Sequence, residues 1–157
     1  MTRTRRFFIL FLSALPAAAS AAAKVNFAGD WKMNPAKSEF GPNYPAPQRQ
    51  TMKITHEDPK LKVNLDQAGE RGEFSAEFNY TTDGKECSNQ IMGNAVKSVL
   101  NWDGDALTFH TTATFNENNI TLDDRWTLSE DGKTLTIKRH FKGGEREADQ
   151  KIVLEKQ

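Results

Sequence analysis

Residues 107–141 read LTFHTTATFNENNITLDDRWTLSEDGKTLTIKRHF. Apolar and polar side chains alternate here in three runs, which are separated by short turns rich in Asn, Asp and Gly. An alternation with a period of two is typical of a β-strand that has one apolar and one solvated face. The stretch therefore predicts three consecutive antiparallel strands. Their apolar face is predicted to consist of Leu107, Phe109, Ala113, Phe115, Ile120, Leu122, Trp126, Leu128, Leu135, Ile137 and Phe141.

The same pattern extends over the chain from Val25 onward. Its turn signals are Asp58-Pro59, Asp83-Gly84, Gly93-Asn94, Asp103-Gly104, the looser Asn116 to Asn119, Asp131-Gly132 and Gly143-Gly144. Short links predict that each strand pairs with the next, and closure removes the exposed edges of such a meander. We predict a single all-β, up-and-down antiparallel β-barrel of about ten strands. The Thr, Lys and His side chains of its outer face cannot form the apolar band of a lipid-embedded barrel.

The start of the chain is typical of a secretory signal peptide. Arg3, Arg5 and Arg6 form a basic start, and an uncharged apolar run over residues 7–15 follows. This run is shorter than the roughly 20 residues that a membrane-spanning helix needs, and small residues at cleavage-site spacing come after it. We therefore expect residues 1–21 to be a signal peptide and residues 22–157 to be the mature domain, exported to the periplasm or secreted, without an integral membrane segment.

The composition excludes several function classes. Without the three arginines of the signal, acidic residues outnumber basic ones by three. This weak negative balance provides no basic stripe for nucleic acid. Cys87 is the only cysteine, so a monomer forms no internal disulfide. The barrel must then be stabilised by the burial of its core.

One connection departs from the short-turn pattern. Residues 34–48 contain four prolines together with Phe40 and Tyr44. The stretch is either a rigid crossover that packs its aromatic rings on one end of the barrel, or a lid across an opening. The sequence leaves both interpretations open.

Gly29, Asp30 and Trp31 form a Gly-x-Trp motif at the head of the first predicted strand. In this position, ahead of a β meander, the motif resembles that of the calycins, the group of lipocalins and fatty-acid-binding proteins. The chain is more closely similar to small secreted bacterial proteins described as lipocalin-like, including the motifs at residues 31–38, 80–86 and 125–133. The resemblance implies a lipocalin-like or fatty-acid-binding-protein-like barrel at residues 22–157 that binds a small apolar ligand.

Period-two alternation places several polar side chains on the inner face. Arg139 and Asp124 each fall between two apolar inward positions, and His56 follows Ile54. An unpaired charge inside a closed barrel costs several kcal/mol, so Arg139 needs a partner. One solution is an ion pair with Asp124 on the neighbouring strand, and another, implied by the calycins, is packing across Trp31. A third is a guanidinium that holds a ligand carboxylate.

Many aromatic side chains share the inner face with these polar groups. Aromatic residues at strand spacing usually form a core, yet a ten-stranded barrel is wider than the roughly eight-stranded size that side chains just fill. The rings therefore either fill the lumen or line a cavity. The residues predicted to contact a lumen ligand are His56, Phe78, Trp102, Phe109, Asp124, Trp126, Arg139 and Phe141.

Catalytic and metal-binding signals are weak. The sequence contains no Gly-x-Ser-x-Gly elbow, phosphate-binding Gly-rich loop or His-x-x-x-His pair. His110 and His140 are predicted to point outward from strands that another strand separates, so they cannot share a metal ion with the inward His56. Cys87 is expected to be a small buried core residue rather than a nucleophile. We expect no catalytic activity, metal or cofactor.

Two functions from different classes fit this pattern. The first is an exported binding protein for a small, largely apolar ligand, which carries a carboxylate if Arg139 anchors it. The second is a filled barrel that acts through its surface as an interaction or structural module; an enzyme in the same fold, such as an isomerase or a haem-dependent catalyst, comes third. A cavity of several hundred Å³ favours the first function. The identity of the ligand and the oligomeric state are left open.

Export predicts a processed N-terminus. The mature protein is expected to begin within a few residues of Ala21 to Ala23, because the basic start, the apolar run and the Ala-Ser-Ala step form a cleavable signal. N-terminal sequencing of native material tests this expectation, and a soluble protein that retains Met1 would contradict it.

Overall fold

The computed structural model describes residues 25–42, 44–70 and 72–157, and the predicted signal peptide at residues 1–21 lies outside them. In the described residues the chain forms ten strands and one short 3₁₀ turn, which confirms the all-β class. Within this part of the chain, no helix is long and apolar enough to span a membrane. The elements are β1 (Gly29–Met33), η1 (Pro35–Lys37), β2 (Arg49–Glu57), β3 (Lys60–Gly69), β4 (Gly72–Thr81), β5 (Glu86–Ile91), β6 (Asn94–Asp103), β7 (Ala106–Phe115), β8 (Asn118–Leu128), β9 (Thr134–Gly143) and β10 (Arg146–Lys156).

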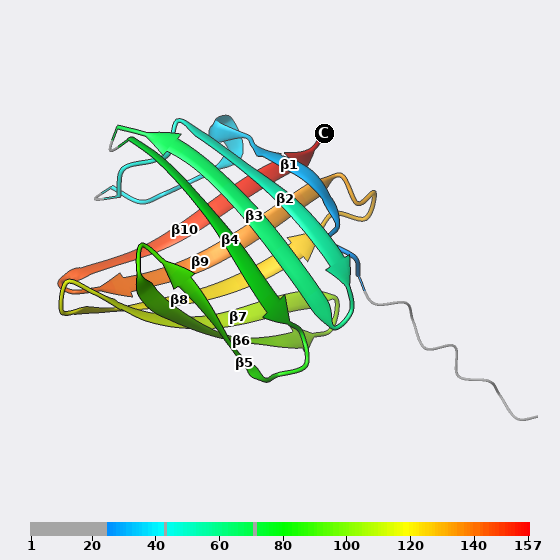
Figure 1. The fold of residues 1–157 in the computed structure, drawn as a ribbon. Coiled ribbons are helices and arrows are strands. Elements are labelled where there is room, and N and C mark those ends of the chain that lie inside the picture. Colours follow the sequence, from blue (N-terminus) through cyan, green and yellow to red (C-terminus); the bar gives the residue numbers. More distant parts are fainter. Residues whose placement is uncertain (1–24, 43, 71) are drawn as a thin grey trace, which may run out of the picture.

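All ten strands belong to one antiparallel sheet with the order β4-β3-β2-β1-β10-β9-β8-β7-β6-β5. The first and last strands pair, with Trp31 opposite Lys156. Figure 1 shows that β1–β4 cross over the remaining strands, and that the sheet curls until its edge strands β4 and β5 face each other. The result is the predicted up-and-down barrel, nearly closed.

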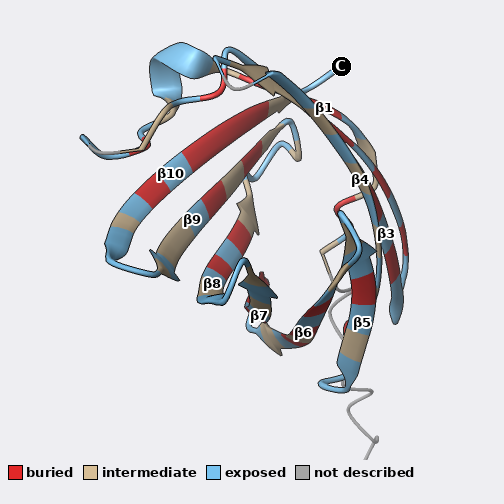
Figure 2. Ribbon diagram, turned by 60° about the vertical axis from the view of Figure 1, so that its left-hand side comes forward, coloured by how far each residue is buried: buried red, intermediate tan, exposed pale blue. Residues whose placement is uncertain are grey.

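The core lies inside the barrel because each strand presents alternate residues to it. Along β2 the inward residues Gln50, Met52, Ile54 and His56 are buried, whereas the residues between them are exposed or half-buried. Figure 2 shows buried and exposed bands alternating along several strands. A slip by one residue would turn the apolar set of a strand outward, so this alternation specifies the strand register.

One end of the barrel is closed by the residues that precede β1. Phe27 is fully buried and stacks on His56 and Trp102, with ring centroids 5.9 Å and 6.0 Å away. Its backbone N–H donates to His56 Nδ1 at 3.1 Å, and its carbonyl accepts a 3.0 Å hydrogen bond from Trp31 Nε1. These bonds hold the Gly-x-Trp segment against the aromatic stack. The segment and the stack together close this end of the barrel and are called the plug below.

The basic side chain at the Trp31 ring is that of Lys156, whose Nζ lies 5.4 Å from the ring centroid. The calycin-based expectation that Arg139 packs across Trp31 is therefore wrong for this chain. Because β1 pairs with β10, Lys156 lies directly opposite Trp31, whereas Arg139 belongs to β9, one strand further away.

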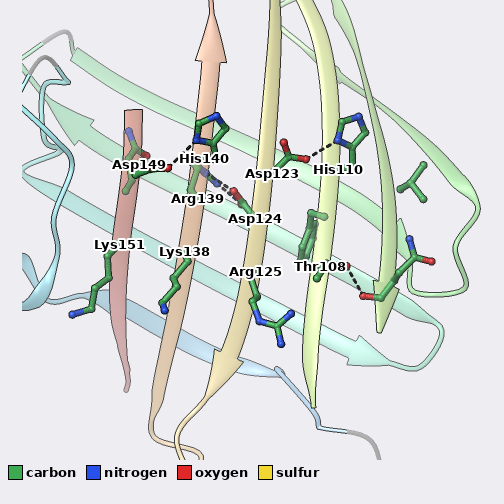
Figure 3. A pocket seen from close by; sticks show the side chains of 14 residues that line it. Thr108, His110, Asp123, Asp124, Arg125, Lys138, Arg139, His140, Asp149 and Lys151 are labelled. Carbon is green, nitrogen blue, oxygen red and sulfur yellow. Dashed lines mark hydrogen bonds and ion pairs between the residues drawn. The ribbon is translucent and has the colours of Figure 1, made fainter. Parts of the chain in front are cut away.

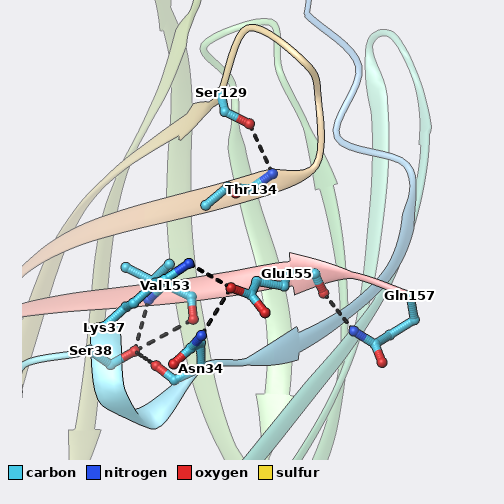
Figure 4. A network of polar contacts seen from close by, with 8 residues as sticks. All are labelled: Asn34, Lys37, Ser38, Ser129, Thr134, Val153, Glu155 and Gln157. Atoms are coloured by element: carbon cyan, nitrogen blue, oxygen red, sulfur yellow. Dashed lines mark hydrogen bonds and ion pairs between the residues drawn. The ribbon is translucent and has the colours of Figure 1, made fainter.

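The Pro-rich connection is anchored on β10 before it crosses to β2 (Figure 4). Asn34 Nδ2 and Lys37 Nζ donate to the Glu155 carboxylate at 2.9 Å and 2.8 Å. Ser38 Oγ donates to Asn34 O at 2.8 Å and accepts from the Val153 N–H at 3.0 Å. These bonds of Asn34, Lys37 and Ser38 thus fix the start of the connection against β10.

The prediction that each strand pairs with the next fails at one place, because β4 and β5 form no ladder. The link between them is tied to other elements instead. The Thr82 N–H donates to Pro59 O at 2.8 Å, and the Gly84 N–H donates to Leu100 O at 3.0 Å. Gly84 has a φ of +77°, and a Cβ at this residue would lie 2.8 Å from Asn101 Oδ1, so this position requires glycine.

Side chains of β5 take the place of the missing ladder. Asn89 Oδ1 accepts from the Asn79 N–H at 2.7 Å, and Asn89 Nδ2 donates to Asn79 O at 3.2 Å. The Cys87 thiol accepts from the Thr81 N–H at 3.1 Å. Cys87, which was expected in the core, is therefore a half-buried residue of the seam between β4 and β5.

Asn89→Ala is expected to lower the free energy of unfolding by about 1–3 kcal/mol, because the N–H and C=O of Asn79 lose their partners. Chemical denaturation measures the loss, and hydrogen exchange at the Asn79 amide should become faster. Gln90→Ala removes an exposed side chain from the next position and is the matched control, with an expected change below about 0.5 kcal/mol. An unchanged exchange rate at Asn79 in Asn89→Ala would show that the side chain does not hold the seam.

Candidate functional site

A cavity of about 380 Å³ lies inside the barrel. Its wall comes from β2–β4 on one side and β6–β9 on the other, with Ile91 and Met92 at the β5–β6 hairpin and Tyr44 from the Pro-rich connection. Most of the lining side chains are apolar or aromatic. This volume lies within the range of roughly 300–1,000 Å³ that is typical of small-molecule sites.

Six of the eight predicted ligand-contact residues line this cavity: Phe78, Phe109, Asp124, Trp126, Arg139 and Phe141. Their contact with a ligand stays a prediction. His56 and Trp102 do not line the cavity and are stacked on each other in the closed end, with ring centroids 6.0 Å apart. Both occupy strand positions next to turns, His56 near the end of β2 and Trp102 near the end of β6. Both side chains face inward, as predicted, but they lie in the plug at the closed end of the barrel and not beside the cavity.

Arg139 and Asp124 form a bidentate ion pair between β9 and β8, where they are direct cross-strand partners. Arg139 Nε and Nη2 donate to Asp124 Oδ1 and Oδ2, both at 2.7 Å. The Asp124 side chain is 7% exposed and that of Arg139 is 27% exposed. Of the three partners considered for Arg139, the structure thus shows the neighbouring carboxylate.

The charges of the cavity follow from this pair. Burial acts to lower the pKa of Arg139, but the charge of Asp124 and the hydrogen bonds to it outweigh burial and hold the pKa above its ordinary value. Burial raises the pKa of the Tyr80 hydroxyl well above its ordinary value, and the charge of Asp124 raises it further. Tyr80 is therefore a neutral phenol beside a compensated ion pair.

Some polar residues of the wall are not among those predicted from the sequence. Gln50 and Thr111 line the cavity, and both could have been found, because Gln50 has the same strand parity as His56 and Thr111 belongs to the inward series of β7. The Pro-rich connection turns out to be a crossover that also covers the cavity. The ring of its Tyr44 meets Phe141 edge-on at 5.5 Å, and both residues line the cavity.

Trp126 contributes a buried aromatic ring to the wall. It is 4% exposed, packs on Phe109 with ring centroids 4.5 Å apart, and lines the cavity. Among the described residues, its Nε1–H has no hydrogen-bond acceptor. A buried unpaired donor costs about 1–3 kcal/mol. Because this nitrogen is shielded from the cavity as well as from solvent, Trp126 contributes its ring to the wall and not its N–H.

A larger depression of about 660 Å³ lies on the outer face of β6–β10. Figure 3 shows His110, Asp123, His140 and Asp149 in one row across β7–β10, where they are successive cross-strand partners. The Nδ1 atoms of His110 and His140 lie 2.6 Å and 2.8 Å from the carboxylates of Asp123 and Asp149. The hydrogen bond to Asp149 raises the pKa of His140 above its ordinary value.

This outer row is a weaker candidate than the cavity. Its side chains are exposed and already paired with one another. In the part of the chain that the structure describes, no group of three or more His, Cys, Asp and Glu side chains could hold a metal ion. The partly open, mainly apolar cavity inside the barrel is therefore the candidate functional site.

Neither a family model nor a curated protein matches the chain. Solved structures do. A secretory abundant heat soluble protein from Ramazzottius varieornatus has a TM-score of 0.57 at 14% identity, over 83% of this chain and 94% of that one. Zebrafish ileal bile acid-binding protein, complexed with cholic acid, has a TM-score of 0.54 at 15% identity, over 83% and 98%. Human cRBP IV has a TM-score of 0.54 at 13% identity, over 85% and 99%. At these identities the likeness shows the fold alone, which is the up-and-down barrel predicted from the sequence.

Arg139→Met is expected to lower the free energy of unfolding by about 3–5 kcal/mol, because it leaves the buried carboxylate of Asp124 without a partner. Replacing both members, as Asp124→Leu with Arg139→Met, should restore most of this loss, since a well-packed apolar pair can replace a buried ion pair. Lys138→Met removes a charge from the adjacent outward position and is the matched control. Thermal and chemical unfolding measure all three variants; equal stabilities of Arg139→Met and Lys138→Met would contradict a structural role for the pair.

Proposed function

We propose that this protein is an exported, non-catalytic binding protein that holds a small, largely apolar ligand in the lumen of its barrel. The observation that carries the proposal is the cavity of about 380 Å³, which has a mainly apolar and aromatic wall and a few convergent polar groups. This combination is typical of small-molecule sites.

Proteins of the same fold support the proposal. The zebrafish neighbour is a bile acid-binding protein whose structure contains cholic acid. The likeness to it extends over 83% of this chain and 98% of that one. A protein of this fold thus binds a small, largely apolar molecule, and the present cavity has room for a small ligand.

The competing interpretation of a filled barrel fits only the closed end. Phe27, Trp31 and the rings stacked on them fill that end. Beyond them the aromatic side chains, among them Phe78 and Phe141, line a cavity that they do not fill. An interaction module without a lumen ligand would have no use for this volume.

The wall of the cavity supports binding over catalysis. Asp124, the one carboxylate among the described residues of the wall, is held by two hydrogen bonds from Arg139, so it is a poor general base. The buried His56 belongs to the plug and does not line the cavity. These features favour a carrier or receptor role.

Export is proposed on the basis of the signal-like residues 1–21. The suggestion that the ligand carries a carboxylate depends on Arg139. This guanidinium already binds the carboxylate of Asp124 through Nε and Nη2, so a ligand carboxylate must either displace Asp124 or bind to Nη1 beside it.

The proposal predicts that the chain binds a neutral apolar dye, and Nile red fluorescence measures this. Ala113→Phe places a large side chain on the cavity wall and is expected to weaken the binding at least tenfold, because the ring takes up ligand volume. Thr112→Phe adds the same ring at the neighbouring exposed position and should leave the affinity unchanged.

Absence of dye binding by the wild-type chain would favour the filled barrel. Equal weakening by the two variants would show that the dye binds outside the lumen. Native mass spectrometry of the exported protein would add the mass of the molecule that co-purifies with it.

A further inference from the structure

The cavity carries no net charge. Among the described residues that line it, only Asp124 and Arg139 have ionised side chains, and the two are bound to each other by two hydrogen bonds of 2.7 Å. Tyr80 stays neutral because burial raises the pKa of its hydroxyl. The remaining polar groups of the wall, such as Gln50 and Thr111, are neutral amides and hydroxyls.

An ionised carboxylate in this cavity would be the third charge beside a compensated pair. It would leave water and gain only the guanidinium atoms that Asp124 does not already use, while the charge of Asp124 repels it. Displacement of Asp124 from Arg139 would leave that 7% exposed carboxylate without its partner. Both routes make a carboxylate an unfavourable polar group for the ligand.

Neutral acceptors are better matched to the wall. The wall includes the amide side chains of Gln50 and Gln67, whose N–H groups are uncharged donors. The bidentate geometry of the ion pair also does not use Arg139 Nη1, whose hydrogens are further donors. A carbonyl, ester or hydroxyl oxygen accepts such hydrogen bonds without bringing a charge.

We infer that the ligand is an apolar molecule with an uncharged oxygen-bearing polar group, and that the Arg139–Asp124 pair discriminates against carboxylates. The inference rests on the proposed function, because it concerns the chemistry of the same cavity. Asp124 then acts as a specificity residue: it cancels the charge that would otherwise attract an anion.

Displacement of Nile red from the mature chain by dodecanol, methyl dodecanoate and dodecanoic acid at neutral pH tests the inference. The three probes share one alkyl chain and differ in the charge of the polar group. The alcohol and the ester are expected to bind at least tenfold more tightly than the acid, which corresponds to about 1.4 kcal/mol. An acid that binds as tightly as the alcohol and the ester, or more tightly, overturns the inference.

Asp124→Asn leaves the charge of Arg139 uncompensated and should reverse this order in favour of the acid. Asp123→Asn removes the same charge from the adjacent, outward-facing residue and should keep the wild-type order. A folded Asp124→Asn variant with the wild-type order overturns the inference. If this variant does not fold, the wild-type series still decides it. If neither the dye nor any of the three probes binds the wild-type chain, the proposed function itself is overturned.

Discussion

A barrel of ten strands encloses more cross-section than its own side chains fill, since roughly eight strands are the size that side chains just fill. The main features of this molecule follow from that constraint. At one end, the segment before β1 brings Phe27 into the lumen, where it completes an aromatic stack with His56 and Trp102. Further along the axis, the described side chains leave a cavity of about 380 Å³.

Closure of the sheet creates a second difficulty, because the edge strands β4 and β5 must meet without a backbone ladder. The amide of Asn89 has one acceptor and one donor, like a peptide group, and it satisfies both backbone groups of Asn79. A side chain can thus bridge a gap that is too wide for direct strand pairing. The seam holds fewer backbone hydrogen bonds than any paired strands of the sheet, so it is where the barrel is expected to open most readily.

Much of this architecture could be predicted from the alternation of residue types. The class, the strand number, the closure and the inward pair of Arg139 and Asp124 all follow from period-two parity and from the pairing of consecutive strands. Parity specifies the face of a residue but not its height along the barrel axis. His56 and Trp102 were for this reason placed among the ligand contacts, although they lie in the plug.

The other differences between the sequence-based prediction and the structure arise from contacts between residues far apart in the sequence. Lys156 approaches Trp31 because the last strand closes on the first, and no local pattern reports which charged residue meets the ring. The seam was missed because the Asp83-Gly84 dipeptide resembles a hairpin turn. In the structure, the adjacent backbone groups bond to Pro59 and Leu100 instead of joining β4 to β5 in a ladder.

The neighbouring residues Asp123 and Asp124 show how far function depends on strand register. Asp123 faces outward and pairs with His110, whereas Asp124 faces the cavity and neutralises Arg139. A slip of β8 by one residue would exchange the two carboxylates and turn Trp126 away from the lumen. The burial of Trp126 opposes this slip, since the ring packs on Phe27 and Phe109. The same register pairs Asp124 with Arg139 at the cavity, where the guanidinium keeps its Nη1 hydrogens as donors. The apolar packing that specifies the register of β8 therefore also specifies the charge and the hydrogen-bond donors that a ligand meets.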